Sequence, residues 1–386
     1  MNILVLNVGS SSIKYELFAN ERSVRAGTID GIGAHAQHTV RGERIHGESR
    51  PVAAANHHEA LRLLFFMLRK EKIRLHAIGH RIVHGGMHDR PIRLTRKLLA
   101  ELHTVSELAP LHNPPQLEAI EACMKLFPVP QVAVFDTAFY HALPPRAAMY
   151  AIPYELAQKY GIRRYGFHGT SHRYVLEQAG NLLRKMLRKD VRKLRVISCH
   201  LGNGCSMTAI AKGKIMDTSM GFTPLEGLMM GTRSGDLDPS IVAFIAEHEH
   251  LSPLDVERML NFQSGLLGVS GLSNDMRVLL KATGARVRLA LDMFVYRVVK
   301  YLGAYTAAMG GIDVIIFTAG IGENCPPIRE RVLAHLTHLG ISLDKRKNSE
   351  NATIISDAKS RVIVMVVHTD EALLIARETA KVMRSR

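Results

Sequence analysis

The chain has 386 residues, of which 47% are hydrophobic and 22% are charged, and its net charge is +15. This composition excludes an intrinsically disordered chain, and the length predicts two domains. The longest apolar runs, such as 362–367, are only as long as a strand, which excludes a helix that spans a bilayer. No secretory signal begins the chain, and four scattered cysteines indicate free thiols. We therefore expect a cytoplasmic protein without a membrane partner.

The positive charge favours anionic ligands, either small molecules or nucleic acid. Basic residues gather at 184–193 and at 345–347. No aromatic residues alternate with them, Trp is absent, and no zinc-finger or recognition-helix signature occurs. Small anionic ligands are therefore the favoured partners and no nucleic acid is expected, although an RNA-binding protein would also explain the charge.

The first predicted element is a hairpin whose turn holds small polar residues. Strand 3–7 leads into the turn 9–12, and strand 13–18 follows it. Asn7 and Lys14 flank the turn, and a lysine next to a serine-rich turn is well placed to meet phosphate.

Two buried strands, 77–83 and 132–135, follow in the first half of the chain. Asp136 comes directly after the second, at the end of a strand where ligands of α/β sheets bind. Arg81 lies within the first, so it needs either a carboxylate partner or a ligand. Between the strands, the sequence predicts a helix to about residue 127 with Asn113 as its N-cap.

A second hairpin repeats the first later in the chain. Strand 196–200 meets the turn 202–204 and continues as strand 206–211, and a further strand ends near Asp217. Two hairpins of one pattern, each followed by alternating strands and helices, predict two related α/β domains. His168, in a tight loop before the second hairpin, opens a helix and is a candidate donor to an anion.

A glycine-bracketed loop at 230–236 carries Arg233 and could deliver its guanidinium to a phosphoryl group. Helices are predicted to start at Asp238-Pro239 and at Ser252-Pro253. A long apolar helix over 285–309 is either a core helix or part of a subunit interface.

Two strands near the C-terminus end on further polar residues. Strand 314–318 leads into the turn 319–322, which suits close approach of a nucleotide, and a helix starts near Pro326. Neither a Rossmann fingerprint nor a Walker lysine motif is present. After strand 362–367, Glu371 is either a helix-start carboxylate or a ligand of Mg²⁺.

These segments together resemble the acetate kinases along nearly the whole chain. The matching runs are 7–14, 80–86, 110–114, 135–139, 165–172, 221–239, 264–277 and 317–324. By that resemblance, the fold is α/β, with two duplicated actin-like ATPase (ribonuclease H-like) domains and a nucleotide cleft between them. The N-terminal domain would cover 1–140, rejoined by the C-terminal helix 373–386, and the other domain 141–372 would hold the nucleotide site and the dimer interface.

The resemblance also implies a reaction: reversible, Mg²⁺-dependent phosphoryl transfer between ATP and acetate by direct in-line displacement, in a homodimer. Mn²⁺ is the alternative ion. The catalytic residues would be Asp136, Arg81, Arg233 and His168, and the acid would be bound by Arg81, Val83, Leu111, Phe167 and Pro224. The ATP-binding residues would be Lys14, His200, Leu201, Gly202, Asn203, Gly204, Asp275, Met276, Arg277, Gly320, Ile321, Gly322 and Asn324. Asn7 and Glu371 would hold the metal.

Other readings stay open from the residues alone. A propionate kinase would share nearly every motif. Acetate is favoured over propionate only because Val83 should shorten the acid pocket. An actin-like ATPase that acts as a binding module is the alternative from another class. The chain departs from the family pattern at Met87, Tyr140, Ala319 and Ala372, all peripheral to the roles above.

Overall fold

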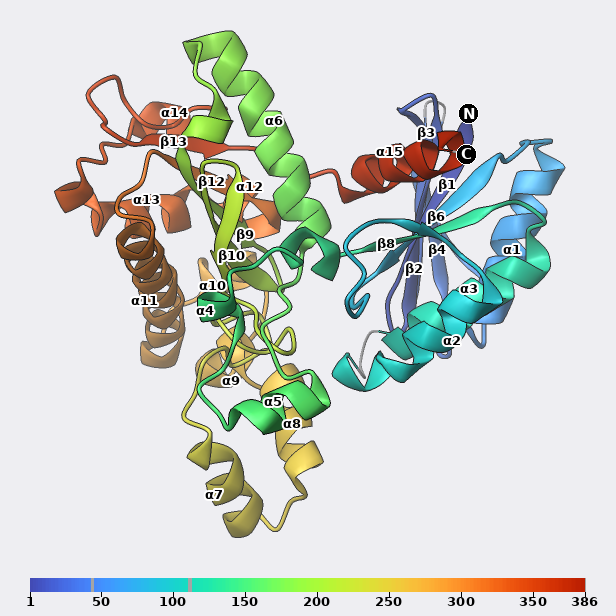
Figure 1. Ribbon diagram of the computed structural model, residues 1–386, viewed down its shortest axis with the longest axis horizontal. Coiled ribbons are helices and arrows are strands. Elements are labelled where there is room, and N and C mark those ends of the chain that lie inside the picture. Colours follow the sequence, from blue (N-terminus) through green and yellow to red (C-terminus); the bar gives the residue numbers. More distant parts are fainter. Residues whose placement is uncertain (43–44, 110–112, 386) are drawn as a thin grey trace. The chain divides into compact units, whose positions relative to one another are not determined.

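The computed structural model describes residues 1–42, 45–109 and 113–385. The chain forms two compact units, Met1–His141 with Asp370–Arg386, and Ala142–Thr369 (Figure 1). Each unit holds one β-sheet with helices packed against it. The first unit is therefore built from both ends of the chain.

The first unit contains an eight-stranded sheet within the described residues. Its strands are β1 (Asn2–Val8), β2 (Ser12–Ala19), β3 (Arg22–Asp30), β4 (Gln37–Gly42), β5 (Ile45–Pro51), β6 (Ala77–Ile82), β7 (Ile92–Arg93) and β8 (Gln131–Phe135). The order across the sheet is β5-β4-β3-β2-β1-β6-β8-β7. Its helices are α1 (His57–Lys70), α2 (Arg96–Thr104), α3 (Asn113–Leu126) and α15 (Glu371–Arg384).

Both faces of this sheet are buried at its strand β1, as the alternation of side chains along that strand shows. Ile3 and Val5 pack in one cluster with Ile375 of α15, whereas Leu4 and Leu6 pack in another with residues of α1 and α3. Figure 1 shows α15 and α3 on opposite sides of the strands. A central strand that is buried on both faces has a continuous run of hydrophobic residues in the sequence. For this reason β1 was easy to predict.

The second unit contains a five-stranded sheet. Its strands are β9 (Arg195–Leu201), β10 (Cys205–Ala211), β11 (Lys214–Thr218), β12 (Val314–Thr318) and β13 (Ile363–Val366), in the order β11-β10-β9-β12-β13. Its helices are α4 (Pro145–Ala148), α5 (Tyr154–Tyr160), α6 (Gly169–Leu187), α7 (Ser240–His248), α8 (Pro253–Phe262), α9 (Gly265–Ser270), α10 (Met276–Leu279), α11 (Ala285–Ala308), α12 (Ala319–Asn324), α13 (Pro326–Ala334) and α14 (Lys345–Ser349).

The two sheets share one topology, which confirms the predicted duplication. In the first, β3, β2 and β1 are antiparallel neighbours, and β6 and β8 continue the sheet parallel to β1. In the second, β11, β10 and β9 are antiparallel neighbours, and β12 and β13 run parallel to β9. The two predicted glycine-containing turns therefore occupy equivalent places, between the first two strands of each repeat.

Two local predictions differ from the structure. Asn113 is the first described residue of α3, and its side chain does not cap the helix because it is engaged with the chain just beyond β6. Its Oδ1 accepts from His84 N at 3.1 Å and its Nδ2 donates to His84 O at 2.9 Å. The predicted turn 319–322 is instead the short helix α12, which continues to Asn324 before α13 begins.

The start of α8 and the end of α11 follow the sequence predictions. Ser252 caps α8 by accepting from Asp255 N at 3.2 Å, and α11 ends just before Gly310. All four cysteines are free and buried. In the part of the chain that the structure describes, no helix is both long and apolar enough to cross a membrane.

Ala319 is the strained residue of α12, because its φ is +65° and its side chain is not glycine. A Cβ in this region costs about 1–2 kcal/mol. We expect Ala319→Gly to raise the free energy of unfolding by about 1 kcal/mol, measured by urea denaturation. The matched control is Ala307→Gly on the exposed face of α11, where glycine should lower it by a similar amount. A loss of stability at position 319 would contradict the strain.

Candidate active site

The first unit gathers an arginine and two carboxylates at the carboxyl ends of its parallel strands. Arg81 Nη2 donates to Asp136 Oδ2 at 2.7 Å, and its Nε lies 3.3 Å from Glu371 Oε2. Asp136 is 1% exposed and follows β8, and Glu371 opens α15. Burial opposes the charge on Arg81, but the two carboxylates outweigh it and raise its pKa above the ordinary value. Arg81 therefore has carboxylate partners and stays a cation.

The other predicted residues of this unit lie close by in the sheet. Asn7 follows Leu6, the last residue of β1 that pairs with β6, and it stands opposite Lys14 in the pairing of β1 with β2. Val83 is buried just beyond β6, and its backbone N donates to Gln116 Oε1 at 3.0 Å. Leu111 lies outside the described residues.

The oxygen donors of this unit fit a magnesium ion. Mg²⁺ uses one or two protein carboxylates and keeps several waters, so it does not need a cage of protein ligands. Asn7 offers an amide oxygen and Glu371 a carboxylate, both at the edge where β1 and β6 end. Over residues 1–42, 45–109 and 113–385, no group of three His, Cys, Asp or Glu could hold a metal ion. Carboxylate and amide oxygens suit Mg²⁺ or Mn²⁺, and they do not suit zinc or copper, which prefer nitrogen and sulfur ligands.

In the second unit, two predicted catalytic residues meet beside the turn between β9 and β10. His168 immediately precedes α6, with a φ of +54°. A Cβ built on Gly204 would lie 3.3 Å from His168 Nε2 and 3.6 Å from Arg233 Nη1. Glycine therefore lets the backbone of the turn approach both side chains, and leaves their nitrogens facing one small region.

Arg233 differs from the paired arginines of the protein. Its Nη1 donates to Pro224 O at 3.3 Å and lies 3.9 Å from Met230 Sδ. Among the described residues no carboxylate forms an ion pair with it, and burial lowers its pKa below the ordinary value. A desolvated guanidinium without a counter-charge is a strong site for an anion.

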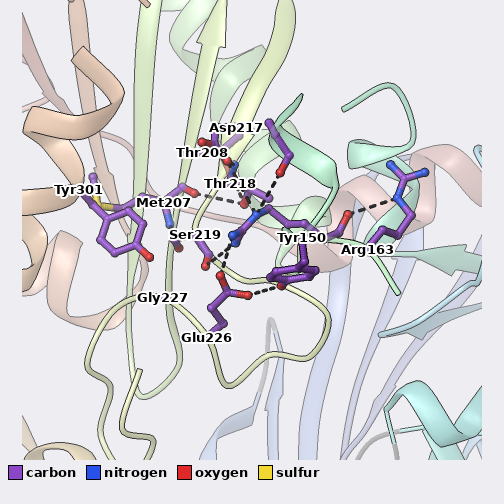
Figure 2. Close-up of polar contacts among 12 residues, drawn as sticks. Tyr150, Arg163, Met207, Thr208, Asp217, Thr218, Ser219, Glu226, Gly227 and Tyr301 are labelled. Carbon is purple, nitrogen blue, oxygen red and sulfur yellow. Dashed lines mark hydrogen bonds and ion pairs between the residues drawn. The ribbon is translucent and has the colours of Figure 1, made fainter. Parts of the chain in front are cut away.

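The loop that carries Pro224 and Arg233 is anchored at two points. At the first, Arg164 Nη2 donates to Glu226 Oε1 at 2.6 Å, and Tyr150 Oη donates to the other oxygen of Glu226 (Figure 2). At the second, Asp236 accepts from Tyr301 Oη at 2.7 Å. Sequence reasoning missed this cluster. Its only signal was the charged Glu226 within the apolar run 223–230.

A pocket of about 560 Å³ brings together eight of the predicted ATP-binding residues. These are Gly202, Asn203, Asp275, Met276, Arg277, Gly320, Ile321 and Asn324. The pocket is also lined by four residues outside the predicted ATP-binding set, Asn274, Leu280, Cys325 and Pro327. Glycine backbones from the β9–β10 turn and from α12, together with apolar and amide side chains, are the lining expected for a nucleotide.

The remaining predicted residues of this unit lie outside that lining. His200 stacks on His168, with ring centroids 4.1 Å apart, and its Nδ1 is 2.8 Å from Ser171 Oγ. Leu201 and Phe167 have buried side chains, and Gly322 packs against the backbone of Phe317. The predicted residues of the second unit therefore fall into three groups. Some line the pocket, others surround His168, and the rest support these two groups.

Comparison with known proteins identifies the family. The model of the acetokinase family matches residues 2–377. The chain belongs to the acetokinase family. The acetate kinase of Halothermothrix orenii is 47% identical, with all of both chains covered. A crystal structure of Porphyromonas gingivalis acetate kinase superimposes with a TM-score of 0.90 at 40% identity, covering 99% of this chain and all of that one.

A solved propionate kinase is just as similar in fold. The enzyme from Francisella tularensis is 42% identical with a TM-score of 0.92, and the match covers 98% of this chain and 99% of that one. Members of the family named for two different acids thus share this chain's structure. With these neighbours, the predicted class of two related α/β units of the actin-like ATPase type is confirmed.

Proposed function

We propose that this protein catalyses reversible phosphoryl transfer between ATP and acetate, giving acetyl phosphate and ADP by direct in-line displacement. The observation that carries the proposal is the Arg233 guanidinium, which lacks a carboxylate partner among the described residues and shares the Gly204 turn with His168. Phosphoryl transfer needs alignment and charge neutralisation more than covalent chemistry from the protein. A cation without a counter-charge, beside a pocket lined by glycines, supplies both.

The second unit would bind ATP and stabilise the moving group. Its pocket would hold the adenosine, and the Gly202–Gly204 backbone would contact the phosphates. Arg233 and His168 would then donate to the equatorial oxygens of the transferring phosphoryl group. The pocket volume suits a nucleotide-sized ligand.

The first unit would bind and orient the acid. Arg81 would hold the acetate carboxylate, and Asp136 would keep Arg81 in place through the 2.7 Å hydrogen bond. A carboxylate is already ionised at neutral pH, so Asp136 is not required as a strong base and its proposed task is orientation. Val83 would contact the methyl group of the acid.

Asn7 and Glu371 would hold Mg²⁺, directly or through waters, with Mn²⁺ as a substitute. The ion would supply charge neutralisation on the phosphate oxygens. The protein's own contribution here is the placement of an amide oxygen and a carboxylate at one edge of the sheet.

The test is to incubate the purified protein with ATP, Mg²⁺ and acetate and to trap acyl phosphate with hydroxylamine. Acetyl hydroxamate is the expected product. If folded protein that binds ATP gives no hydroxamate with acetate, propionate or butyrate, the phosphotransfer proposal fails and the ATPase alternative takes its place.

Propionate is the second candidate acid, because a relative of equal similarity is a propionate kinase. We expect acetate to be preferred, since Val83 would shorten the pocket. Val83→Ala should raise the ratio of kcat/KM for propionate to that for acetate by about tenfold, because one methylene is worth about 1–3 kcal/mol. Val132→Ala, which removes the same atoms from the core, is the control and should leave the ratio unchanged. An unchanged ratio in Val83→Ala would remove Val83 from the pocket.

We also propose that the protein is a homodimer joined through its second unit. Helix α7 buries none of its residues within the described chain, and Phe244 on it is 60% exposed. Leu254 of α8 and Tyr296 of α11 are 70% and 61% exposed. Large apolar side chains exposed on several helices indicate an interface. Light scattering should give twice the chain mass of 42.8 kDa, and Phe244→Asp should lower it toward one chain. A single-chain mass for the unaltered protein would refute the dimer.

A further inference from the structure

A line of hydrogen bonds runs from the buried interior of the second unit to His168. Ser198 Oγ on β9 lies 2.9 Å from His172 Nδ1, and His172 Nε2 lies 2.8 Å from Ser206 Oγ on β10. Ser206 Oγ in turn lies 2.9 Å from His168 Nδ1. Ser198, His172 and Ser206 are all fully buried. None of these three was singled out by its sequence position.

The direction of each hydrogen bond follows from counting protons. Among the described residues, His172 is the only hydrogen-bond partner of the Ser198 hydroxyl. If Ser198 accepted from His172, its own buried proton would lack an acceptor, at a cost of about 1–3 kcal/mol. Ser198 therefore donates to His172 Nδ1.

The same count then fixes the other links. Burial, and next to it the charge of His200, lowers the pKa of His172 well below the ordinary value, so this imidazole is neutral. With Nδ1 accepting, its single proton is on Nε2 and is donated to Ser206 Oγ. Ser206 has one proton left, which it donates to His168 Nδ1. His168 in its neutral form then carries its proton on Nε2.

We propose that Ser198, His172 and Ser206 are positioning residues that hold His168 as the Nε2–H tautomer, so that a neutral imidazole donates to a phosphoryl oxygen. Nε2 is the nitrogen that lies toward Gly204 and Arg233. The opposite tautomer would present a lone pair to an anionic oxygen, which repels it. The inference deepens the proposed function and rests on it for the identity of the acceptor. The tautomer itself does not depend on catalysis.

The tautomer is measured directly by long-range proton–nitrogen NMR of the full protein labelled with ¹⁵N-histidine, with His168→Gln used to assign the His168 signals. We expect Nδ1 of His168 to be unprotonated and Nε2 to carry the proton. Ser206→Ala should convert these signals to a mixture of tautomers. Ser198→Ala should do the same, although it does not touch His168, and this effect at a distance is the signature of a chain of donors.

Kinetics of the same variants test the consequence. Ser206→Ala should lower kcat about tenfold and leave KM for ATP and acetate within about twofold, because only a donor to the transferring group is disturbed. Ser356→Ala removes another buried serine of this unit, one that accepts from Val364 N, and should leave both the His168 signals and kcat unchanged.

Either of two results would overturn the inference. One is a proton on Nδ1 of His168 in the unaltered protein at neutral pH. The other is unchanged His168 signals in both Ser206→Ala and Ser198→Ala. Absence of acetyl phosphate formation with the expected tautomer in place would instead refute the proposed function and leave the hydrogen-bond chain standing.

Discussion

Replacing Arg233 by alanine should lower kcat for acetyl phosphate formation about a thousandfold, the loss typical of an arginine that stabilises a transferring phosphoryl group. The physical reason is that its guanidinium is half-buried and has no carboxylate partner in the part of the chain described. Its charge is therefore available to an anion. Within residues 1–42, 45–109 and 113–385 its side chain contacts the Pro224 carbonyl and the Met230 thioether and forms no ion pair, so the substitution breaks none there. Stability should change little while turnover collapses.

The measurement is the hydroxamate assay under saturating ATP and acetate, with urea denaturation of the same preparations. Arg192→Ala is the matched control, because this arginine is exposed and its one ion pair among the described residues is with Asp190, two residues away. It should keep the activity of the unaltered protein. If Arg233→Ala lowers kcat less than tenfold, this arginine does not contact the transferring phosphoryl group.

Replacing Arg81 by alanine should lower both activity and stability. It removes the arginine that pairs with the carboxylate of Asp136, which is 1% exposed. Removing one partner of such a buried pair costs about 3–5 kcal/mol in the free energy of unfolding. Glu371 is affected less, because it is 20% exposed and lies at the start of α15, where the helix dipole favours a negative charge. Acetate binding should be lost with the guanidinium.

A double substitution separates the two effects. Arg81→Ala with Asp136→Asn removes the stranded charge while keeping the shape of the side chain, so urea denaturation should recover most of the lost stability. Hydroxamate formation should stay absent, because the cation proposed to hold the acid is still missing. If the double variant regained activity, Arg81 would serve only to neutralise Asp136 and the acid would bind elsewhere.

Local sequence patterns predicted the strands and most helix starts because these features depend on neighbours along the chain. Two hairpins were predictable because small turn residues, 9–12 and 202–204, lie between apolar runs. Ser252 was predictable as a cap because its partner is three residues away. Asn113 was not predictable as it is used, since its actual partner, His84, is 29 residues away and follows β6. Short-range rules cannot choose between a local and a distant acceptor.

The sequence by itself therefore determined the duplicated α/β pattern, the family and the residue types available for phosphoryl transfer. Only the tertiary structure decided which charges meet. The sequence left either a carboxylate or a ligand as the partner of Arg81, and the fold brings Asp136 and Glu371 to it from distant segments. The fold also left Arg233 without a carboxylate among the described residues and aligned Ser206 with His168. The reason is physical. Strand and turn propensities act over a few residues, whereas charge pairing and proton direction depend on atoms that only folding brings within hydrogen-bond distance.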